Sequence, residues 1–377
     1  MLIFDASECI PIYIANQNPY ARLCAEDLAK DLARVNRAGL RPRFLDKEEK
    51  SCIVIEENDP SIEDPITDES FRILIKDQKI RISAPTYFGT MWGIYTFSQK
   101  ILGIDPCYLF HALPSPSYER MEAADTQIYE SGSDFGFRGA FINDEDLLTG
   151  WKDGGGKRNI DYPWYGTTVS PEIMDMVVET LLRLKINLVI PASFLDIENP
   201  PEKHLADCVA RRGIYISQHH IEPLGLSHFT FENYCKRFGK VGTYSYLSSA
   251  ELLEEAWRYY VKKWSCYERV VWQLGLRGKA DRPIWEEETP SDKELCEYGK
   301  FIGDAIEKQR HIVLEETKGK ARYFTSTLWM EGSLLMERGY LRISPDVCLV
   351  FSDNGPNQMF GNEYLQVPRK ADRRYGI

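Results

Sequence analysis

The stretch that decides the fold of this chain reads Phe137-Arg138-Gly139-Ala140-Phe141-Ile142-Asn143-Asp144-Glu145. A short apolar run is followed by a cluster of polar side chains, and this pattern predicts a buried strand that ends in carboxylates. In an α/β barrel the active site lies where the carboxyl ends of the strands meet the loops that follow them. Taken alone, the stretch also fits a strand that runs into a solvated acidic turn. The barrel is favoured because the pattern recurs at later strand ends.

Strands and helices alternate after residue 137, which is typical of a parallel sheet or barrel. The predicted strands cover residues 137–144, 187–192, 214–220, 270–275, 322–328 and 347–351. The predicted helices cover residues 171–185, 201–212, 250–263, 292–314 and 331–338. A seventh strand begins only at residues 375–377, whereas a closed barrel of this type has eight strands. We therefore expect a (β/α)8 TIM-type barrel that is incomplete at its C-terminus.

Residues 1–125 are predicted to form a separate, small N-terminal α/β domain, which leaves residues 126–377 for about six βα units of the barrel. Short apolar strands are expected at residues 10–15, 52–55, 71–75 and 80–82, with helices at residues 19–35 and 87–102. Residues 106–130 are rich in proline and are interpreted as an irregular connection between the two domains.

The composition narrows the class of partners. The 377 residues carry a net charge of −11, which argues against nucleic acid because that ligand requires a basic surface. No apolar run approaches the ~20 residues of a membrane span, and no signal peptide is visible at the N-terminus. No two of the nine cysteines are spaced C-x-x-C, so a disulfide framework is not expected. We therefore expect a protein that binds neither nucleic acid nor membranes and that is cytoplasmic, or secreted if the N-terminus has been trimmed.

Polar residues cluster at the ends of the predicted strands, where a barrel forms the rim of its active site. The clusters are Asn143, Asp144 and Glu145; His219, His220 and Glu222; Arg277 and Asp281; Trp329 and Glu331; and Asp353 and Asn354. Glycoside hydrolysis requires a carboxylic acid and a carboxylate. Because Asp144, Asp281 and Glu331 follow three different strands, they are predicted to face one another across the mouth of the barrel. A histidine and an arginine on the same rim suit a substrate that carries its own carboxylate.

No metal or cofactor is expected. His219 and His220 are adjacent on a predicted strand and would point to opposite faces, which disfavours a bis-histidine metal site. The sequence Gly154-Gly155-Gly156-Lys157 lacks the spacing of a phosphate-binding loop and is interpreted as a mobile βα loop. A metal-dependent barrel hydrolase stays open as a third hypothesis, weaker than a glycoside hydrolase or a non-catalytic carbohydrate-binding protein.

Seven of these short motifs resemble glycoside hydrolase family 115, the xylan α-1,2-glucuronidases. In order along the chain, they lie at residues 92–99, 138–145, 182–192, 205–223, 275–281, 329–331 and 350–354. The resemblance implies an inverting, exo-acting α-glucuronidase that removes glucuronic acid or its 4-O-methyl ether from xylan. It also implies an N-terminal α/β domain, a (β/α)8 barrel and further C-terminal domains.

The resemblance implies roles for individual residues as well. Asp281 and Glu331 become the acid/base pair, with Asp144 as a third carboxylate. The implied substrate-binding residues are Asn143, His219, His220, Arg277, Trp329 and Gln99. Gln99 and Trp329 stand where the family has a glutamate and a tyrosine, and residues 278–280 lack its usual acidic, glycine-rich stretch. The seventh-strand Tyr-Tyr-His motif of the family would begin beyond residue 377.

Two alternatives stay open at this point. The absent βα units also fit a non-catalytic or partner-dependent remnant, whose ligand would again be an acidic oligosaccharide or polysaccharide. The open edge of the barrel leaves room for a second copy of the chain, so a homo-oligomer is one option.

Overall fold

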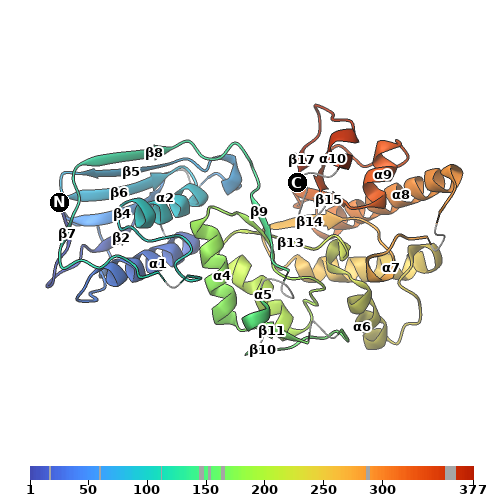
Figure 1. The fold of residues 1–377 in the computed structure, drawn as a ribbon, viewed down its shortest axis with the longest axis horizontal. Helices are drawn as coiled ribbons and strands as arrows, with labels where there is room; N and C mark the ends of the chain where they lie inside the picture. Colours follow the sequence, from blue (N-terminus) through green and yellow to red (C-terminus); the bar gives the residue numbers. More distant parts are fainter. Residues whose placement is uncertain are drawn as a thin grey trace. The chain divides into compact units, whose positions relative to one another are not determined.

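The computed structural model of the protein describes residues 1–16, 18–58, 61–111, 113–143, 148–151, 154–162, 166–285, 289–352 and 362–377. The chain forms two compact units (Figure 1). The first unit consists of Met1–Ala140, Asp175–Leu188 and Arg211–Gly213, and the second of Phe141–Met174, Val189–Ala210 and Ile214–Ile377. The domain boundary expected at residue 125 stays a prediction.

The first unit is built on a six-stranded sheet with the strand order β3-β2-β4-β6-β5-β8. The strands are β2 Ile12–Ile14, β3 Phe44–Leu45, β4 Cys52–Glu57, β5 Phe71–Lys76, β6 Lys79–Ala84 and β8 Thr126–Glu130. Strand β2 is parallel to β3 and β4, and β4 is parallel to β6, whereas β5 is antiparallel to β6 and β8. A separate antiparallel pair joins β1 (Leu2–Phe4) to β7 (Met121–Glu122).

The connection predicted to be irregular at residues 106–130 therefore contains two strands, β7 and β8, and that prediction is wrong for these segments. Strand β8 lies at the edge of the sheet, and most of its side chains are exposed. Such a strand lacks the apolar alternation of a half-buried strand, which explains why its sequence gave no strand signal.

Two helices pack on this sheet, α1 (Pro19–Val35) and α2 (Tyr87–Lys100), and they also contact each other (Figure 1). Helix α2 is buried at every residue from Tyr87 to Ser98, as expected of a helix that is apolar all round. Gly89 and Gly93 permit its close approach to the sheet. A Cβ at Gly89 would lie 2.2 Å from the carbonyl oxygen of Ser70, and one at Gly93 2.7 Å from Cγ2 of Ile82.

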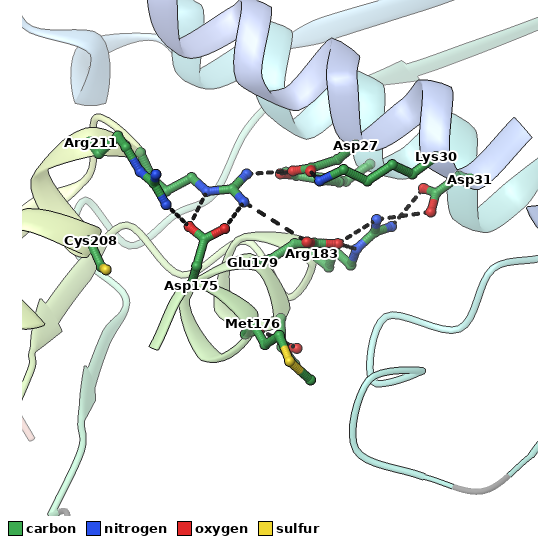
Figure 2. A network of polar contacts seen from close by, with 12 residues as sticks. Asp27, Lys30, Asp31, Asp175, Met176, Glu179, Arg183, Cys208 and Arg211 are labelled. Atoms are coloured by element: carbon green, nitrogen blue, oxygen red, sulfur yellow. Dashed lines mark hydrogen bonds and ion pairs between the residues drawn. The ribbon is translucent and has the colours of Figure 1, made fainter. Parts of the chain in front are cut away.

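A buried ion network stabilises the first unit (Figure 2). Arg183, on α4 (Pro171–Arg183), donates to both carboxylate oxygens of Asp31 on α1, at 2.9 and 3.0 Å. It also donates to Oε1 of Glu179, at 2.8 and 3.0 Å. Arg212 donates to both oxygens of Asp175, at 3.1 and 2.9 Å, and forms a further ion pair with Asp27.

Four charged side chains of this network are almost completely buried. The side chains of Arg183 and Arg212 are 2% and 3% exposed, and those of Asp27 and Asp31 1% and 0%. Burial raises the pKa of Asp31, while Arg183 acts in the opposite direction. Because charges of both signs are removed from water here, each depends on its partner, and the loss of one would leave another buried and unpaired.

The second unit contains a seven-stranded sheet with the order β17-β16-β15-β14-β13-β12-β9. The strands are β9 Gly139–Phe141, β12 Leu188–Ile190, β13 Tyr215–Ser217, β14 Val270–Leu274, β15 Tyr323–Leu328, β16 Val347–Phe351 and β17 Tyr375–Gly376. The pairs from β13 to β17 are parallel. The sheet is curled into half a barrel, so the predicted mixed α/β class and parallel sheet are confirmed.

Helices alternate with the strands of this sheet, as predicted. After α4 they are α5 Pro200–Arg211, α6 His228–Phe238, α7 Tyr246–Trp264, α8 Asp292–Glu316, α9 Glu331–Glu337 and α10 Asn362–Gln366. Short 3-10 turns occur at η1 Pro65–Thr67, η2 Thr149–Trp151, η3 Pro223–Gly225 and η4 Lys279–Asp281. Within the described ranges, no helix is long and apolar enough to cross a membrane.

Two local differences from the sequence-based expectation concern the surroundings of the sheet. Helix α6 was not predicted. The glycine-rich stretch expected to be a mobile loop forms strand β10 (Gly154–Lys157), which pairs antiparallel with β11 (Thr167–Val169). Glycine is required there, because a Cβ at Gly155 would lie 2.0 Å from the carbonyl oxygen of Val169.

Candidate active site

Six predicted site residues of the second unit follow three neighbouring parallel strands, so the sheet brings them to one edge. They are His219 and His220 after β13, Arg277 and Asp281 after β14, and Trp329 and Glu331 after β15.

Arg277 connects the two carboxylates of this group. Its Nη1 donates to Oε1 of Glu331 at 2.7 Å, and its Nε lies 2.5 Å from Oδ1 of Asp281. Its Nη2 also donates to the backbone carbonyl of Asp281, at 2.5 Å. The arginine is 7% exposed. Because one buried guanidinium contacts both groups, Asp281 and Glu331 lie on the same side of the sheet edge and share one site.

Glu331 is the first residue of α9 and is 8% exposed. Burial raises the pKa of its carboxyl, Arg277 opposes the shift, and the charge of Asp281 adds to it. The second carboxylate oxygen, Oε2, is buried and has no hydrogen-bond partner among the described residues. A carboxyl with these properties retains its proton more readily than an exposed one, as a general acid must.

The backbone before Glu331 is held in an unusual conformation. Met330 has a φ of 44°, a left-handed value that is uncommon for a residue with a side chain. The first turn of α9 is fixed to the end of β15, because Oγ of Ser333 donates to the carbonyl of Leu328 at 2.9 Å. These contacts fix the position from which Glu331 reaches Arg277.

Asp281 lies in a tight turn in which Ala280 and Asp281 have φ values of 57° and 59°. The turn is closed by the N–H of Gly278, which donates to the carbonyl of Arg282 at 2.8 Å. His220 completes the surroundings of the aspartate, with Nε2 3.2 Å from Oδ1 of Asp281. The carboxylate of Asp281 thus lies between a guanidinium and an imidazole.

The two histidines lie side by side, which corrects the prediction that they point to opposite faces. Their ring centroids are 4.2 Å apart in an edge-to-face arrangement. The prediction was wrong because β13 ends at Ser217, so the alternation of a strand does not extend to the histidines. The ring of His219 packs on Phe141 at 4.5 Å, and that of His220 lies 6.1 Å from Trp329.

The ring of His219 is half-buried. Burial lowers its pKa well below the usual value, and the neighbouring His220 and Arg277 act in the same direction. Its Nδ1 is buried without a hydrogen-bond partner among the described residues. A neutral imidazole with an unoccupied ring nitrogen is suited to bind a polar group of a substrate.

Glu222 holds the backbone of His219 and was not predicted to do so. Its Oε1 accepts from the N–H of His219 at 3.2 Å, and its Oε2 from the N–H of Leu195 at 2.9 Å. The carboxyl is almost completely buried, and burial raises its pKa to about 8. Glu222 therefore positions the strand end that carries both histidines.

Replacing Glu222 with glutamine should change how stability depends on pH. In the folded protein the carboxyl keeps its proton up to about pH 8, whereas an unperturbed carboxyl ionises near 4.5. Between these values the unfolded state binds fewer protons, so the native protein loses stability as pH rises, on the order of 1 kcal/mol per pH unit. Urea unfolding at several pH values measures the free energy of unfolding of both proteins. The value for the glutamine variant should rise relative to that of the native protein as the pH increases. A difference that does not depend on pH would contradict this assignment.

A cavity of about 600 Å³ opens at this edge of the sheet. Three predicted residues line it, namely Asn143, His219 and Asp281. Asn143 also accepts a hydrogen bond from Oγ of Ser193, at 3.4 Å. Sequence reasoning missed several other lining residues, which are Asp161, Ser193, Phe194, His228, Phe229, Glu232, Asn233, Lys236 and Lys279.

Five of the missed residues lie on α6, whose sequence does contain a helix signal. Ser227 caps the helix through a capping box with Thr230. Phe231, Tyr234, Cys235 and Phe238 follow the i, i+3, i+4, i+7 spacing of an amphipathic helix. The aromatic wall of the cavity begins on this helix, where Phe229 lies 3.9 Å from His228 and 5.2 Å from Phe194 between ring centroids.

A buried arginine holds the segments of the cavity lining that adjoin α6. Arg158 donates from Nε to Oε1 of Glu202 at 3.1 Å and from Nη2 to the carbonyl of Ser193 at 2.5 Å. The next residue, Asn159, donates from its backbone to Oε2 of Glu202 at 2.9 Å and from Nδ2 to Asp196 at 3.0 Å. The lining residues 159–162 and 193–194 are therefore fixed to one another.

A second brace holds the start of the loop that carries Arg277. The buried side chain of Gln309, on α8, accepts from the N–H of Gly275 at 2.9 Å and donates to its carbonyl at 2.7 Å. Both polar groups of Gly275 are thereby paired just beyond the end of β14. Nothing in the local sequence indicates this contact, because Gln309 is 34 residues away.

The structure leaves the roles of the remaining predicted residues untested. Asp144, Glu145, Asp353 and Asn354 lie outside the described residues. Gln99 is exposed on α2 in the first unit and does not line the cavity, and its role stays a prediction. Among the residues that the structure describes, no group of three or more histidine, cysteine, aspartate or glutamate side chains is arranged to hold a metal ion.

Comparison with known proteins was made for both sequence and fold. The sequence profile described as Glycosyl hydrolase family 115 matches residues 132–375. A solved structure described as a family GH115 4-O-methyl-alpha-glucuronidase with specificity for decorated arabinogalactans matches with a TM-score of 0.73 at 20% identity. The match covers 91% of this chain and 45% of the other, so this chain spans less than half the length of that relative.

Two more distant structures share the fold alone. One is a chitobiase from Flavobacterium johnsoniae, which matches with a TM-score of 0.56 at 12% identity; the match covers 95% of this chain and 53% of the chitobiase. The other is a GH20 β-N-acetylhexosaminidase from Streptomyces coelicolor A3(2), which matches with a TM-score of 0.55 at 12% identity; the match covers 97% of this chain and 68% of the hexosaminidase. No curated protein sequence gives a significant match.

Proposed function

The chain belongs to glycoside hydrolase family 115, and from this premise we propose that it hydrolyses the bond between an α-linked uronic acid and a polysaccharide. The uronic acid of the proposal is glucuronic acid or its 4-O-methyl ether, and the polymer is xylan or a related polysaccharide. The name of the family 115 relative, which includes decorated arabinogalactans, supports a branched plant polymer as substrate class.

The observation that carries the proposal is the contact of Arg277 with both Asp281 and Glu331. Hydrolysis of a glycosidic bond needs an acid to protonate the leaving oxygen and a second carboxylate. Burial favours the protonated form of Glu331, so we assign it as the general acid. Asp281, which lines the cavity, is then the base that removes a proton from the attacking water.

The proposed reaction proceeds with inversion. Glu331 gives its proton to the glycosidic oxygen while water, activated by Asp281, attacks the anomeric carbon from the opposite face. The uronate carboxylate of the substrate is assigned to Arg277 and the neighbouring His219 and His220, with Asn143 at the cavity wall. We also propose that the half-barrel is part of a (β/α)8 barrel and that Asp144 adds a third carboxylate to its mouth.

Proton NMR of the reaction with glucuronoxylan tests this proposal. An inverting enzyme releases the β-anomer of the uronic acid first, and the α-anomer grows in only as the sugar mutarotates. Initial release of the α-anomer would contradict the inverting mechanism, and no release of uronic acid from any uronic-acid-bearing polymer would contradict the proposed function.

A further inference from the structure

A second cavity, of about 1670 Å³, adjoins the candidate active site within the second unit. It is bounded by α6, residues 239–245, the start of α7, residues 277–285 and two residues of α8. Glu232, Lys236, Lys279 and Ala280 line both this cavity and the smaller one, so the two are neighbours that share a wall. We call the larger cavity the basic groove.

The charges of the basic groove are opposite in sign to that of the whole chain. Its described lining contains five cations and one carboxylate, whereas the chain carries a net charge of −11. The cations are Lys236, Lys240, Arg277, Lys279 and Arg282, and the carboxylate is Glu232. An excess of cations in a hollow favours an anionic ligand.

Two of these cations are available for a ligand. Lys279 pairs with Glu232 at 3.2 Å, and Lys240 pairs with Glu255 at 3.1 Å. In the part of the chain that the structure describes, neither Lys236 nor Arg282 forms an ion pair. Both side chains are exposed, so they can bind an anion without first breaking a contact within the protein.

Four aromatic rings are among the residues that line the groove. Trp285 and Tyr298 stack with their ring centroids 5.0 Å apart and an angle of 26° between the ring planes. Tyr246 and Phe301 lie beside each other at 5.3 Å. All four line the groove and are only partly buried. Flat, partly exposed rings offer apolar surface on which the C–H face of a sugar ring can pack.

We propose that the basic groove binds the part of the substrate polymer beyond the cleaved uronic acid, and that Lys236 and Arg282 bind a second carboxylate of that polymer. The inference rests on the proposed function and specifies its substrate class as a polysaccharide with closely spaced uronic acids. The groove adjoins the site, has more than twice its volume, and combines aromatic surface with two cations that form no ion pair with any described residue. A neutral main chain would use the aromatic rings but leave both cations without a partner.

The Arg282→Met variant tests this proposal, because Arg282 lines only the basic groove. With densely substituted glucuronoxylan, KM should rise about 2- to 5-fold at low salt and kcat should not change, since an exposed ion pair is worth at most about 1 kcal/mol. Adding Lys236→Met should raise KM further. The rise should shrink in high salt, which screens exposed charges. With an aryl α-glucuronide, which has no polymer to occupy the groove, Arg282→Met should behave as the native protein does.

The matched control removes the same number of charges at positions of α8 that line neither cavity. Lys293 and Lys300 are exposed on that helix, and Lys293→Met, alone or with Lys300→Met, should leave KM unchanged. An equal rise in KM in the controls, or no rise in Arg282→Met, overturns the proposal. An equal loss with the aryl glucuronide also overturns it, since that would place Arg282 in the active site.

Affinity electrophoresis in glucuronoxylan gels separates failure of the groove from failure of the proposed function. If the native protein hydrolyses no uronic acid linkage, the proposed function fails while the groove is still tested by binding alone. Retardation of the native protein that Lys236→Met and Arg282→Met together abolish supports the groove. Equal retardation of native and doubly substituted protein, or none for either, overturns it.

Discussion

Glu331→Gln is expected to reduce the turnover of a uronic-acid-bearing polymer by about 10²- to 10⁴-fold, the usual contribution of a general acid. Glutamine preserves the shape of the side chain and a carbonyl oxygen for Nη1 of Arg277, but it has no proton to give to the leaving oxygen. The fold should survive, because Asp281 still contacts the arginine and the carbonyl oxygen of the glutamine can still accept from it. Initial rates and the near-ultraviolet circular dichroism spectrum measure the two effects separately.

The role of Glu331 can be distinguished from that of a base by the choice of leaving group. In an aryl α-glucuronide with an acidic phenol, the phenolate leaves without being protonated. Hydrolysis of this substrate by the variant should therefore fall far less than hydrolysis of the polymer. Glu337→Gln, an exposed position on the same helix, is the matched control and should be active on both substrates. An equal loss on both substrates in Glu331→Gln would move the acid role to another residue.

Arg212→Met should lower the free energy of unfolding by about 3–5 kcal/mol, the usual cost of breaking a buried ion pair from one side. The substitution keeps much of the side chain's apolar volume but leaves Asp27 and Asp175 without their buried cation. The adjacent Arg211 is the matched control, because it contacts the same aspartate while its side chain is 55% exposed. Arg211→Met should cost at most about 1 kcal/mol. Urea unfolding of the three proteins measures the difference.

The pH dependence of the Arg212→Met variant provides a second test. Burial acts to raise the pKa of Asp175, but the hydrogen bonds and charge of Arg212 hold it below its ordinary value, so this carboxyl binds a proton more readily once Arg212 is removed. The deficit of the variant relative to the native protein should therefore become smaller as the pH falls. Equal destabilisation by Arg211→Met and Arg212→Met, or a deficit that grows in acid, would show that the network does not act through buried charge.

The sequence identified the helices and strands whose apolar residues form a continuous run or recur at regular spacing. The parallel strands from β13 to β16 and the helices α7 and α8 appear as runs of apolar residues or as amphipathic repeats, and their predicted positions agree with the structure to within a few residues. The exposed edge strand β8 gave no such signal. Helix α6 did carry one, and its omission hid most of one wall of the cavity.

For the candidate site, the predicted strand ends showed which residues lie close together, but the sequence did not show how their side chains are oriented. Placing Arg277, Asp281 and Glu331 after neighbouring strands was enough to predict that they meet. The side-by-side histidines depended on where β13 ends, and a difference of three residues in the end of the strand reversed the expected orientation. The braces from Glu222 and Gln309 could not be predicted, since they depend on backbone groups that become neighbours only when the chain has folded.

The clamp of Gln309 on Gly275 has a consequence for divergence among relatives of this protein. The segment that follows it is fixed at one end by that clamp and at the other by the turn between Gly278 and Arg282, with Arg277 held inward between them. The side chain of Arg282 lines the groove alone and takes part in none of these contacts. Mutations at position 282 can therefore accumulate without moving Arg277, and a lineage can change its preferred polymer while the residues of its active site stay the same.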